Sequence, residues 1–266
     1  MRLQVYLART GLATSRRKAE ELIKAGKVKI NKQTAKLGAR INPNKDIVEV
    51  DGKTIRPISK KLYIMLNKPI GYLVAKSDSK GRKLAYDLLK EHSINKEKLS
   101  EEEFNSLFNV GRLDYNTEGL LLFTNDGNFA LNLTHPRYRV RKVYIAKVKG
   151  IISNKAIKKI EHGVYIKVKE NGKIVEEYKS QPAKVRILGR GKKGYSVLVI
   201  KIAEGRKREV RRICATVGYP VLSLKRIQIG TLQLGDLPVG KWRFLTKKEL
   251  DRLKKYLVLK SSKYIK

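Results

Sequence analysis

Short apolar runs of strand length recur from residue 62 onward and constrain the fold more than any other feature of the sequence. Runs of this length are typical of β-strands, whereas helices need longer periodic patterns. Helical patterns separate only some of the runs, so regular alternation of strand and helix is absent. We therefore expect an α+β fold with a mixed, mainly antiparallel sheet over residues 62–250. The expected strands are LYIML (62–66), GYLVA (71–75), LLLF (120–123), VYIAKV (143–148), AKVRIL (183–188) and YSVLVIKI (195–202), and the expected helices lie near 84–90, 100–108, 127–134, 153–161, 207–217 and 246–256.

Residues 1–58 are expected to form a separate small module. A helix is predicted over residues 2–9, and a second begins after an N-cap at Thr14 or Ser15 and ends at Gly26. KVKIN (27–31) reads as a strand, and DIVEVDGKTI (46–55) reads as a hairpin that turns at Asp51-Gly52. RPISKK (56–61) is the predicted linker, and residues 251–266 are predicted to form a basic tail with weak patterning.

The charge balance points to a polyanionic partner. Lys and Arg together number 61 against 24 Asp and Glu, which gives a formal net charge of +37. Nucleic acid is the expected partner, because each phosphate that a basic side chain neutralises also releases counterions. A membrane surface is the competing partner, but it requires a basic amphipathic segment or an anchor, and neither is evident. Without a signal core or a run of ~18 apolar residues, we expect a cytoplasmic protein.

Metal and disulfide chemistry find no support in the sequence. Cys214 is the single cysteine, so neither an intramolecular disulfide nor a cysteine-based zinc site is expected. The three histidines are far apart and lack metal-binding spacing. We expect no metal and no cofactor.

The N-terminal module carries cations where a helix disfavours them. Arg16, Arg17 and Lys18 lie in the first turn of the second predicted helix, at the positive end of its dipole. This placement favours an external anion such as phosphate, and a solvated charged face is the alternative. The predicted RNA-binding residues of the module are Arg2, Arg16, Arg17, Lys18, Lys24 and Lys27.

The run GRGKKG (189–194) fits a dinucleotide-binding pattern only superficially. Such a site requires a strand before the glycines and a helix after them. Strands are predicted on both sides here, so we interpret the run as a basic hairpin loop.

Polar groups are densest in GRLDYNTEGLLLFTNDG (111–127). Asp114 lies in a polar loop just ahead of the apolar run LLLF, where a carboxylate can face a cleft. A turn or cap aspartate is the alternative that the residues alone favour. Asp126-Gly127 is expected to be a simple turn.

The segment EGRKREVRRICATVG (204–218) predicts an amphipathic helix with clustered arginines. Arg208, Arg211 and Arg212 share one face at i, i+3 and i+4, opposite the apolar stripe that contains Cys214. Three arginines on one face repel each other unless an anion lies among them, which points to RNA phosphate, the Asp114 carboxylate, or both. Cys214 is interpreted as an unreactive core thiol.

At these residues the chain resembles the bacterial ribosomal RNA pseudouridine synthases of the RsuA/RluB type, over about residues 2–250. The first sixty residues resemble the small RNA-binding module of ribosomal small-subunit protein four. LNKPIG (66–71), GRLDYNTEGLLLFTNDG, EGRKREVRR and PVLSLKRIQIGTLQLGDLPVGKWRFLT (220–246) are similar to family motifs. Glu209 departs from the pattern, where an uncharged residue such as glutamine is expected.

The resemblance implies an enzyme that isomerises a specific uridine of ribosomal RNA, with the large subunit favoured, to pseudouridine on a flipped-out base. It implies that Asp114 is the nucleophile, that Tyr144 stacks on the base, and that Arg211 forms an ion pair with Asp114. Further RNA contacts are expected from Arg112, Lys142, Arg208 and Arg212. The expected substrate is a structured stem-loop of ribosomal RNA, and the enzyme is expected to be a monomer.

Two other functions compete with this one. A non-catalytic RNA-binding ribosome-assembly factor would keep the fold without needing Asp114, Tyr144 and Arg211 together. A general polyanion-binding protein, driven by charge alone, would bind duplex DNA and structured RNA equally at matched salt.

Overall fold

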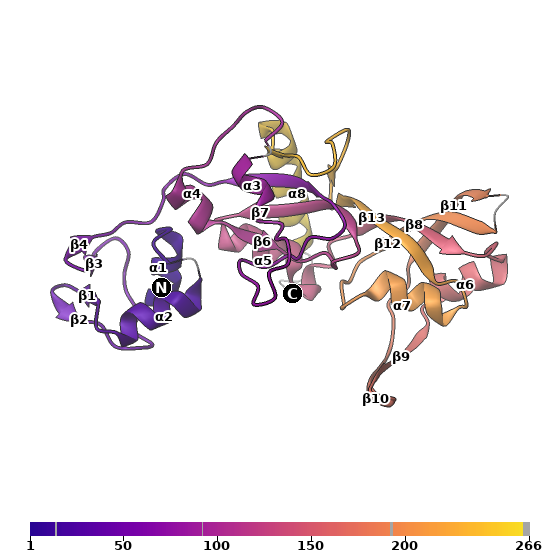
Figure 1. The fold of residues 1–266 in the computed structure, drawn as a ribbon, viewed down its shortest axis with the longest axis horizontal. Helices are drawn as coiled ribbons and strands as arrows, with labels where there is room; N and C mark the ends of the chain where they lie inside the picture. The colour runs from indigo at the N-terminus through magenta and orange to yellow at the C-terminus, as the bar shows by residue number, and fades with distance from the viewer. Residues whose placement is uncertain (14, 92, 192–193, 263–266) are drawn as a thin grey trace.

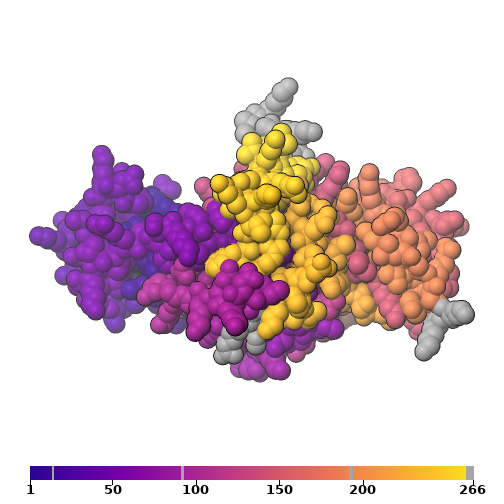
Figure 2. Space-filling view, turned by 90° about the horizontal axis from the view of Figure 1, so that it is seen from above, coloured from indigo at the N-terminus to yellow at the C-terminus, as the bar shows by residue number. Residues whose placement is uncertain are grey.

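The computed structural model describes residues 1–13, 15–91, 93–191 and 194–262. A small N-terminal module lies at one end of the molecule, and a large β-sheet runs from its middle to the other end (Figure 1). On the face that Figure 2 shows, the C-terminal segment in yellow lies between the N-terminal module and the orange residues near 200. None of the helices in this described part of the chain is long and apolar enough to cross a bilayer.

The N-terminal module has its own sheet and its own apolar core. The order of its antiparallel sheet is β2-β1-β3-β4, and the β3–β4 hairpin turns at Asp51 and Gly52, both with positive φ as expected. The Ser15 hydroxyl caps the second helix by accepting the Lys18 N–H at 3.1 Å, while the alternative cap Thr14 lies outside the described residues. The elements are α1 (Leu3–Arg9), α2 (Arg16–Lys24), β1 (Val28–Ile30), β2 (Gln33–Thr34), β3 (Val48–Val50) and β4 (Lys53–Thr54).

The module docks against α4 (Glu101–Ser106) of the larger part. Gly11, at φ +78°, lies so close to this helix that an added Cβ would be 2.4 Å from the Glu102 carbonyl oxygen. Lys60 forms an ion pair with Glu103 at 2.9 Å. Ser100 and Glu103 cap α4 reciprocally, as the run of three glutamates after a serine predicts.

The large sheet is mixed and mainly antiparallel, as predicted. Its strands follow the order β11-β12-β8-β13-β7-β5-β15, with β14 beside β13 and β6 beside β7. Only β13 and β7 run parallel among the described pairs. The strands are β5 (Tyr63–Lys68), β6 (Phe108–Val110), β7 (Glu118–Thr124), β8 (Lys142–Lys149), β11 (Lys184–Gly191), β12 (Tyr195–Ile202), β13 (Val221–Ile229), β14 (Leu232–Gln233) and β15 (Trp242–Phe244); β9 (Tyr165–Glu170) and β10 (Lys173–Lys179) form a separate hairpin.

Both faces of the central strands are buried. Ile64 and Leu66 of β5 enter one apolar cluster, whereas Tyr63 and Met65 enter the other, which follows from the two-residue repeat of a strand. The first cluster also receives the apolar residues of α3 (Leu88–Glu91), α6 (Asn154–His162) and α7 (Glu209–Thr216), and the second receives those of α5 (Gly127–Thr134) and α8 (Lys247–Ser262). Cys214 is fully buried in the first cluster, as expected of a core thiol.

Three local expectations need correction. GYLVA (71–75) is not a strand, because Gly71 turns with φ +80° and only Leu73 makes an isolated bridge; its apolar residues pack into the core from an irregular segment. α8 confirms the helix expected near 246–256 but continues to Ser262, so residues 257–262 of the predicted tail are helical, with Leu257 buried in the second cluster; residues 263–266 lie outside the described part. Asp126 is an N-cap, because its carboxylate accepts the N–H groups of Asn128 and Phe129.

The run GRGKKG connects two strands, as expected. β11 ends at Gly191 and pairs antiparallel with β12, which begins at Tyr195, while residues 192–193 lie outside the described part. The helix that a dinucleotide site requires does not follow these glycines.

Candidate active site

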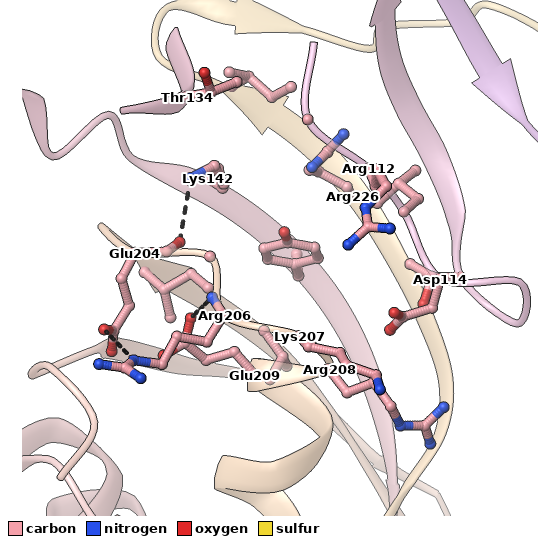
Figure 3. Close-up of a pocket in the computed structure, with 18 of the residues that line it drawn as sticks. Arg112, Asp114, Thr134, Lys142, Glu204, Arg206, Lys207, Arg208, Glu209 and Arg226 are labelled. Carbon is pink, nitrogen blue, oxygen red and sulfur yellow. Dashed lines mark hydrogen bonds and ion pairs between the residues drawn. The ribbon is translucent and has the colours of Figure 1, made fainter. Parts of the chain in front are cut away.

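A cavity of about 660 Å³ opens between the loop ahead of β7, the strands β8 and β13, and the segment that leads into α7. Figure 3 shows Asp114 and Arg112 on one side of this cavity, and Glu204, Arg206 and Glu209 on the other. Its volume lies within the ~300–1,000 Å³ typical of small-molecule sites. The cavity is therefore large enough for a flipped-out nucleoside.

Asp114 presents its carboxylate at the wall of this cavity. The residue is half-buried, and its side chain makes no hydrogen bond or ion pair with any other described residue. Its main-chain carbonyl accepts the Thr117 N–H at 3.0 Å, which closes the loop into a tight turn just ahead of β7. The fold thus leaves both oxygens of the Asp114 carboxylate available to bind a ligand.

Lys68 holds the Asp114 loop through hydrogen bonds to its main-chain carbonyl groups. Its ammonium is fully buried at the end of β5 and donates to the carbonyl oxygens of Pro69, Tyr115 and Thr117 at 2.7, 3.4 and 3.0 Å. Burial lowers the pKa of Lys68 to about 8, although the Asp114 carboxylate opposes this shift. A buried cation close to the loop stabilises the negative charge of Asp114.

Gly119 allows the Asp114 loop to lead directly into β7 beside β13. An added Cβ at Gly119 would lie 2.3 Å from the Arg226 carbonyl oxygen, and its φ of +105° disfavours other residues. This close approach allows β7 to pair with β13 through Gly119 and Arg226. The parallel pairing brings the Asp114 loop to the strand that carries Arg226.

Arg211 lies close to Asp114 but holds its loop through the backbone. The guanidinium donates to the Asn116 carbonyl oxygen at 2.7 Å and to the Val221 carbonyl oxygen at 3.2 Å, and its Nε is buried without a partner. Burial lowers the pKa of Arg211, and the charge of Asp114 opposes that shift. The predicted ion pair is not among the described contacts within 4.0 Å, because the guanidinium is occupied by the two carbonyl groups.

Tyr144 lies on β8 at the floor of the cavity. Its side chain is 8% exposed and also belongs to the first apolar cluster. In the register of the sheet, it lies between Ile200 of β12 and Arg226 of β13. The strand thus fixes the position of an aromatic ring that forms part of the cavity wall.

The structure brings together some of the predicted RNA-binding residues and separates others. Arg112 and Arg208 are exposed at the cavity, whereas Arg212 forms an ion pair with Glu176 of β10 at 3.8 Å. Arg208 precedes α7 as its N-cap in the left-handed conformation, so it does not continue the helix as expected. The predicted cations of the N-terminal module are all exposed and do not line the cavity: Arg2, Arg16, Arg17, Lys18, Lys24 and Lys27.

Lys142, which is expected to contact RNA, is half-buried and lines the cavity. Its ammonium is buried beside the segment ahead of α7 and donates to the Glu204 carbonyl oxygen at 3.2 Å. Burial lowers the pKa of Lys142 to about 8, and the Arg226 charge adds to this effect. The contact with Glu204 holds the backbone of the basic segment at the cavity wall.

Arg226 was not singled out from the sequence, although it lies in the motif-like segment 220–246. It is 3% exposed, donates from Nε to the Leu120 carbonyl oxygen at 2.8 Å, and keeps one terminal nitrogen buried without a partner. It also lines the cavity. An unpartnered guanidinium nitrogen at this wall is a further donor for a bound ligand.

Glu209, the departure from the expected pattern, lies buried at the same cavity. Its carboxyl accepts the Arg206 N–H at 2.8 Å and is 3% exposed. Burial and the neighbouring Glu204 carboxyl raise the pKa of Glu209 to about 8. The raised pKa favours the protonated, uncharged form of Glu209, which can form hydrogen bonds as a glutamine does. No group of three or more potential metal-ligating side chains occurs among the described residues.

Comparisons with known proteins agree with this geometry. The family model described as RNA pseudouridylate synthase matches residues 62–216, and the S4 domain model matches residues 1–47. An uncharacterised RNA pseudouridine synthase of Aquifex aeolicus is 42% identical over 98% of this chain and 96% of its own length. The ribosomal large subunit pseudouridine synthase B of Bacillus subtilis is 41% identical over 95% of each chain. A crystal structure of a pseudouridylate synthase superposes with a TM-score of 0.65 and 27% identity, covering 95% of this chain and 99% of that one.

Proposed function

Because the chain belongs to the RNA pseudouridine synthase family, we propose that it converts one specific uridine of large-subunit ribosomal RNA to pseudouridine. The observation that carries this proposal is the unengaged Asp114 carboxylate at the wall of a cavity of nucleoside size. The likeness to a large-subunit enzyme over 95% of the chain supports the choice of RNA. The proposed substrate is a folded stem-loop, and the proposed site of action is the cytoplasm.

The proposed reaction needs a nucleophile, an aromatic face on which the base stacks, and positive charges near the nucleophile. The uridine must leave its stack to reach Asp114, and Tyr144 then supplies the face on which the base stacks, worth ~1–3 kcal/mol. The N1–C1′ bond breaks, the base turns, and C5 bonds to C1′. The proton leaves C5 and N1 gains one, so the product is an isomer of the substrate and no co-reactant is consumed.

The residues around Asp114 support its role as nucleophile. Lys68 and Arg211 hold the loop through main-chain carbonyl groups, which leaves both oxygens of Asp114 for the substrate. Their positive charges stabilise the carboxylate in a site from which the base excludes water. Tyr144 lies within the same cavity, in a position to assist removal of the C5 proton.

The N-terminal module is proposed to supply RNA affinity. Its exposed cations, such as Arg16 and Arg17, lie outside the cavity, and the module docks on α4 rather than on the site. A flipped uridine carries little sequence information, so a second basic surface on the surrounding RNA fold would select the correct stem-loop. The enzyme is proposed to act as a monomer.

Release of tritium from a large-subunit rRNA transcript labelled at C5 of uridine tests this function. The wild type and the charge-matched control Asp236→Asn, at an exposed aspartate, should release tritium, whereas Asp114→Asn should not. Asp114→Asn should still bind the transcript. A wild type that releases no tritium would favour the non-catalytic assembly factor, and an Asp114→Asn variant as fast as the wild type would contradict the role of Asp114 as nucleophile.

A further inference from the structure

A second, basic groove lies at the far end of α7 from the catalytic cavity. α6 contributes Lys155, Lys158, Lys159 and His162, and the start of β9 adds Tyr165. No aspartate or glutamate lines the groove; Glu161 lies on α6 but is not part of the lining. The lining therefore carries net positive charge with no carboxylate to compensate it.

The cations of this groove are available to a ligand. Lys155, Lys158 and Lys159 are exposed, and none of them forms an ion pair within 4.0 Å with another described residue. Tyr165 is 68% exposed, and the Lys179 ammonium lies 5.7 Å from the centre of its ring. Three free ammonium groups beside an exposed aromatic ring form a surface suited to a nucleic-acid strand.

α7 connects this groove to the catalytic cavity. Its first residue, Glu209, lines the cavity together with the preceding Arg208, and Thr216 at its other end lines the groove. Arg212 and Thr216 are four residues apart on α7, so they lie along one face of the helix. In Figure 1, α6 and α7 lie together at the end of the molecule opposite the N-terminal module.

The distance between the cavity and the groove suits an RNA strand that continues from the target nucleotide. The eight residues of α7 span ~12 Å, a length that a nucleic-acid strand at ~3.4 Å per nucleotide covers in about four nucleotides. Arg212 lies midway along the helix and forms an ion pair with Glu176 at 3.8 Å. Basic residues therefore lie at the cavity (Arg208), on α7 (Arg212) and at the groove (the α6 lysines).

We propose that the groove between α6, β9 and the end of α7 binds the phosphate backbone of the RNA strand that flanks the target uridine. This proposal rests on the proposed function, since it assigns a place to the flank of that substrate. It adds a second anchoring surface, on the opposite side of the cavity from the N-terminal module. The two surfaces would then hold the RNA on both sides of the flipped base.

The salt dependence of RNA binding tests the groove directly. The groove variant is Lys155→Gln, Lys158→Gln and Lys159→Gln, and the matched control removes the same charge from α8 as Lys247→Gln, Lys248→Gln and Lys255→Gln. Binding to an unmodified large-subunit rRNA transcript is measured across a range of KCl concentrations. Each lost phosphate contact should reduce the slope of log affinity against log salt by about 0.7–0.9.

The groove variant should therefore lose about two units of slope, and the control should lose much less. At saturating RNA, turnover of the groove variant should remain within about twofold of the wild type, because Lys155, Lys158 and Lys159 lie outside the catalytic cavity. A groove variant with the wild-type slope, or a control that loses as much, would overturn the proposal. The slope is a binding measurement, so it stands whether or not the transcript is isomerised.

Discussion

Replacing Glu209 with glutamine should make the stability of the catalytic domain less dependent on pH. Glu209 is 3% exposed, and burial beside Glu204 raises its pKa to about 8 from an ordinary 4.5. A folded-state pKa above the unfolded one means that unfolding releases a proton between these two values. The contribution of protonated Glu209 to folding stability is complete below about pH 4.5 and is lost as the pH rises toward 8.

The size of the effect follows from the shift. Each pH unit between the two pKa values costs at most about 1.4 kcal/mol of folding free energy. Because the neighbouring Glu204 carboxyl contributes to the raised pKa of Glu209, we expect about 1 kcal/mol per unit. Glutamine keeps an oxygen to accept the Arg206 N–H and does not titrate. The Glu209→Gln variant should therefore gain about 2 kcal/mol relative to the wild type between roughly pH 5 and pH 7.

Urea unfolding followed by tryptophan fluorescence measures this gain. Trp242 is the only tryptophan and lies 1% exposed on β15, so its emission reports on the catalytic domain. Glu170→Gln, at an exposed glutamate, controls for the loss of one carboxylate. A difference between Glu209→Gln and the wild type that stays constant with pH would refute the raised pKa of Glu209.

Three further outcomes follow from the contacts. Arg211→Ala should reduce turnover by about 100-fold with a much smaller loss of RNA affinity, since it frees the Asp114 loop; equal losses would make Arg211 only a phosphate contact. Deletion of residues 1–58 should leave a folded catalytic domain, by circular dichroism, with weaker RNA binding; an unfolded fragment would contradict the proposed boundary. Gly119→Ala should destabilise the protein by about 2–4 kcal/mol in urea, because its Cβ would lie 2.3 Å from the Arg226 carbonyl oxygen; wild-type stability would contradict this packing.

The sequence correctly predicted the elements that are fixed by interactions within a few residues. Ser100 with Glu103 marks the start of α4, and the Asp51-Gly52 pair marks the hairpin of the N-terminal module. Both depend on hydrogen bonds or dihedral angles within a few residues. The same is true of the periodic apolar positions of α6 and α7, which the sequence placed to within two residues.

Expectations that depend on distant partners were less accurate. GYLVA (71–75) has the composition of a strand, but the Gly71 N–H is bound to the Tyr115 carbonyl oxygen rather than to a neighbouring strand. The helix expected near 246–256 continues to Ser262 because Leu257 also packs in the second apolar cluster with residues of α5. Neither partner is adjacent in the sequence, so a local pattern could not distinguish these outcomes.

In the candidate site, too, the local motif was predicted correctly, whereas contacts with distant residues were not. The motif around Asp114 predicted which residues gather at the cavity, but not which groups their side chains contact. Arg211 binds the Asn116 and Val221 carbonyl groups, and Lys142 is buried against Glu204, because the backbone between β7 and α7 converges there. Lys68 and Arg226 carry no sequence signal beyond their motif-like segments, since their importance arises from burial.

The measurement that tests the central claim most directly is a pseudouridine map of ribosomal RNA from cells with and without this gene. Carbodiimide-dependent stops of reverse transcription locate each modified uridine. The account predicts that one stop in large-subunit RNA disappears with the gene, returns with the wild type and with Asp236→Asn, and does not return with Asp114→Asn. A map that does not change when the gene is removed, or a stop that Asp114→Asn restores, would contradict the account.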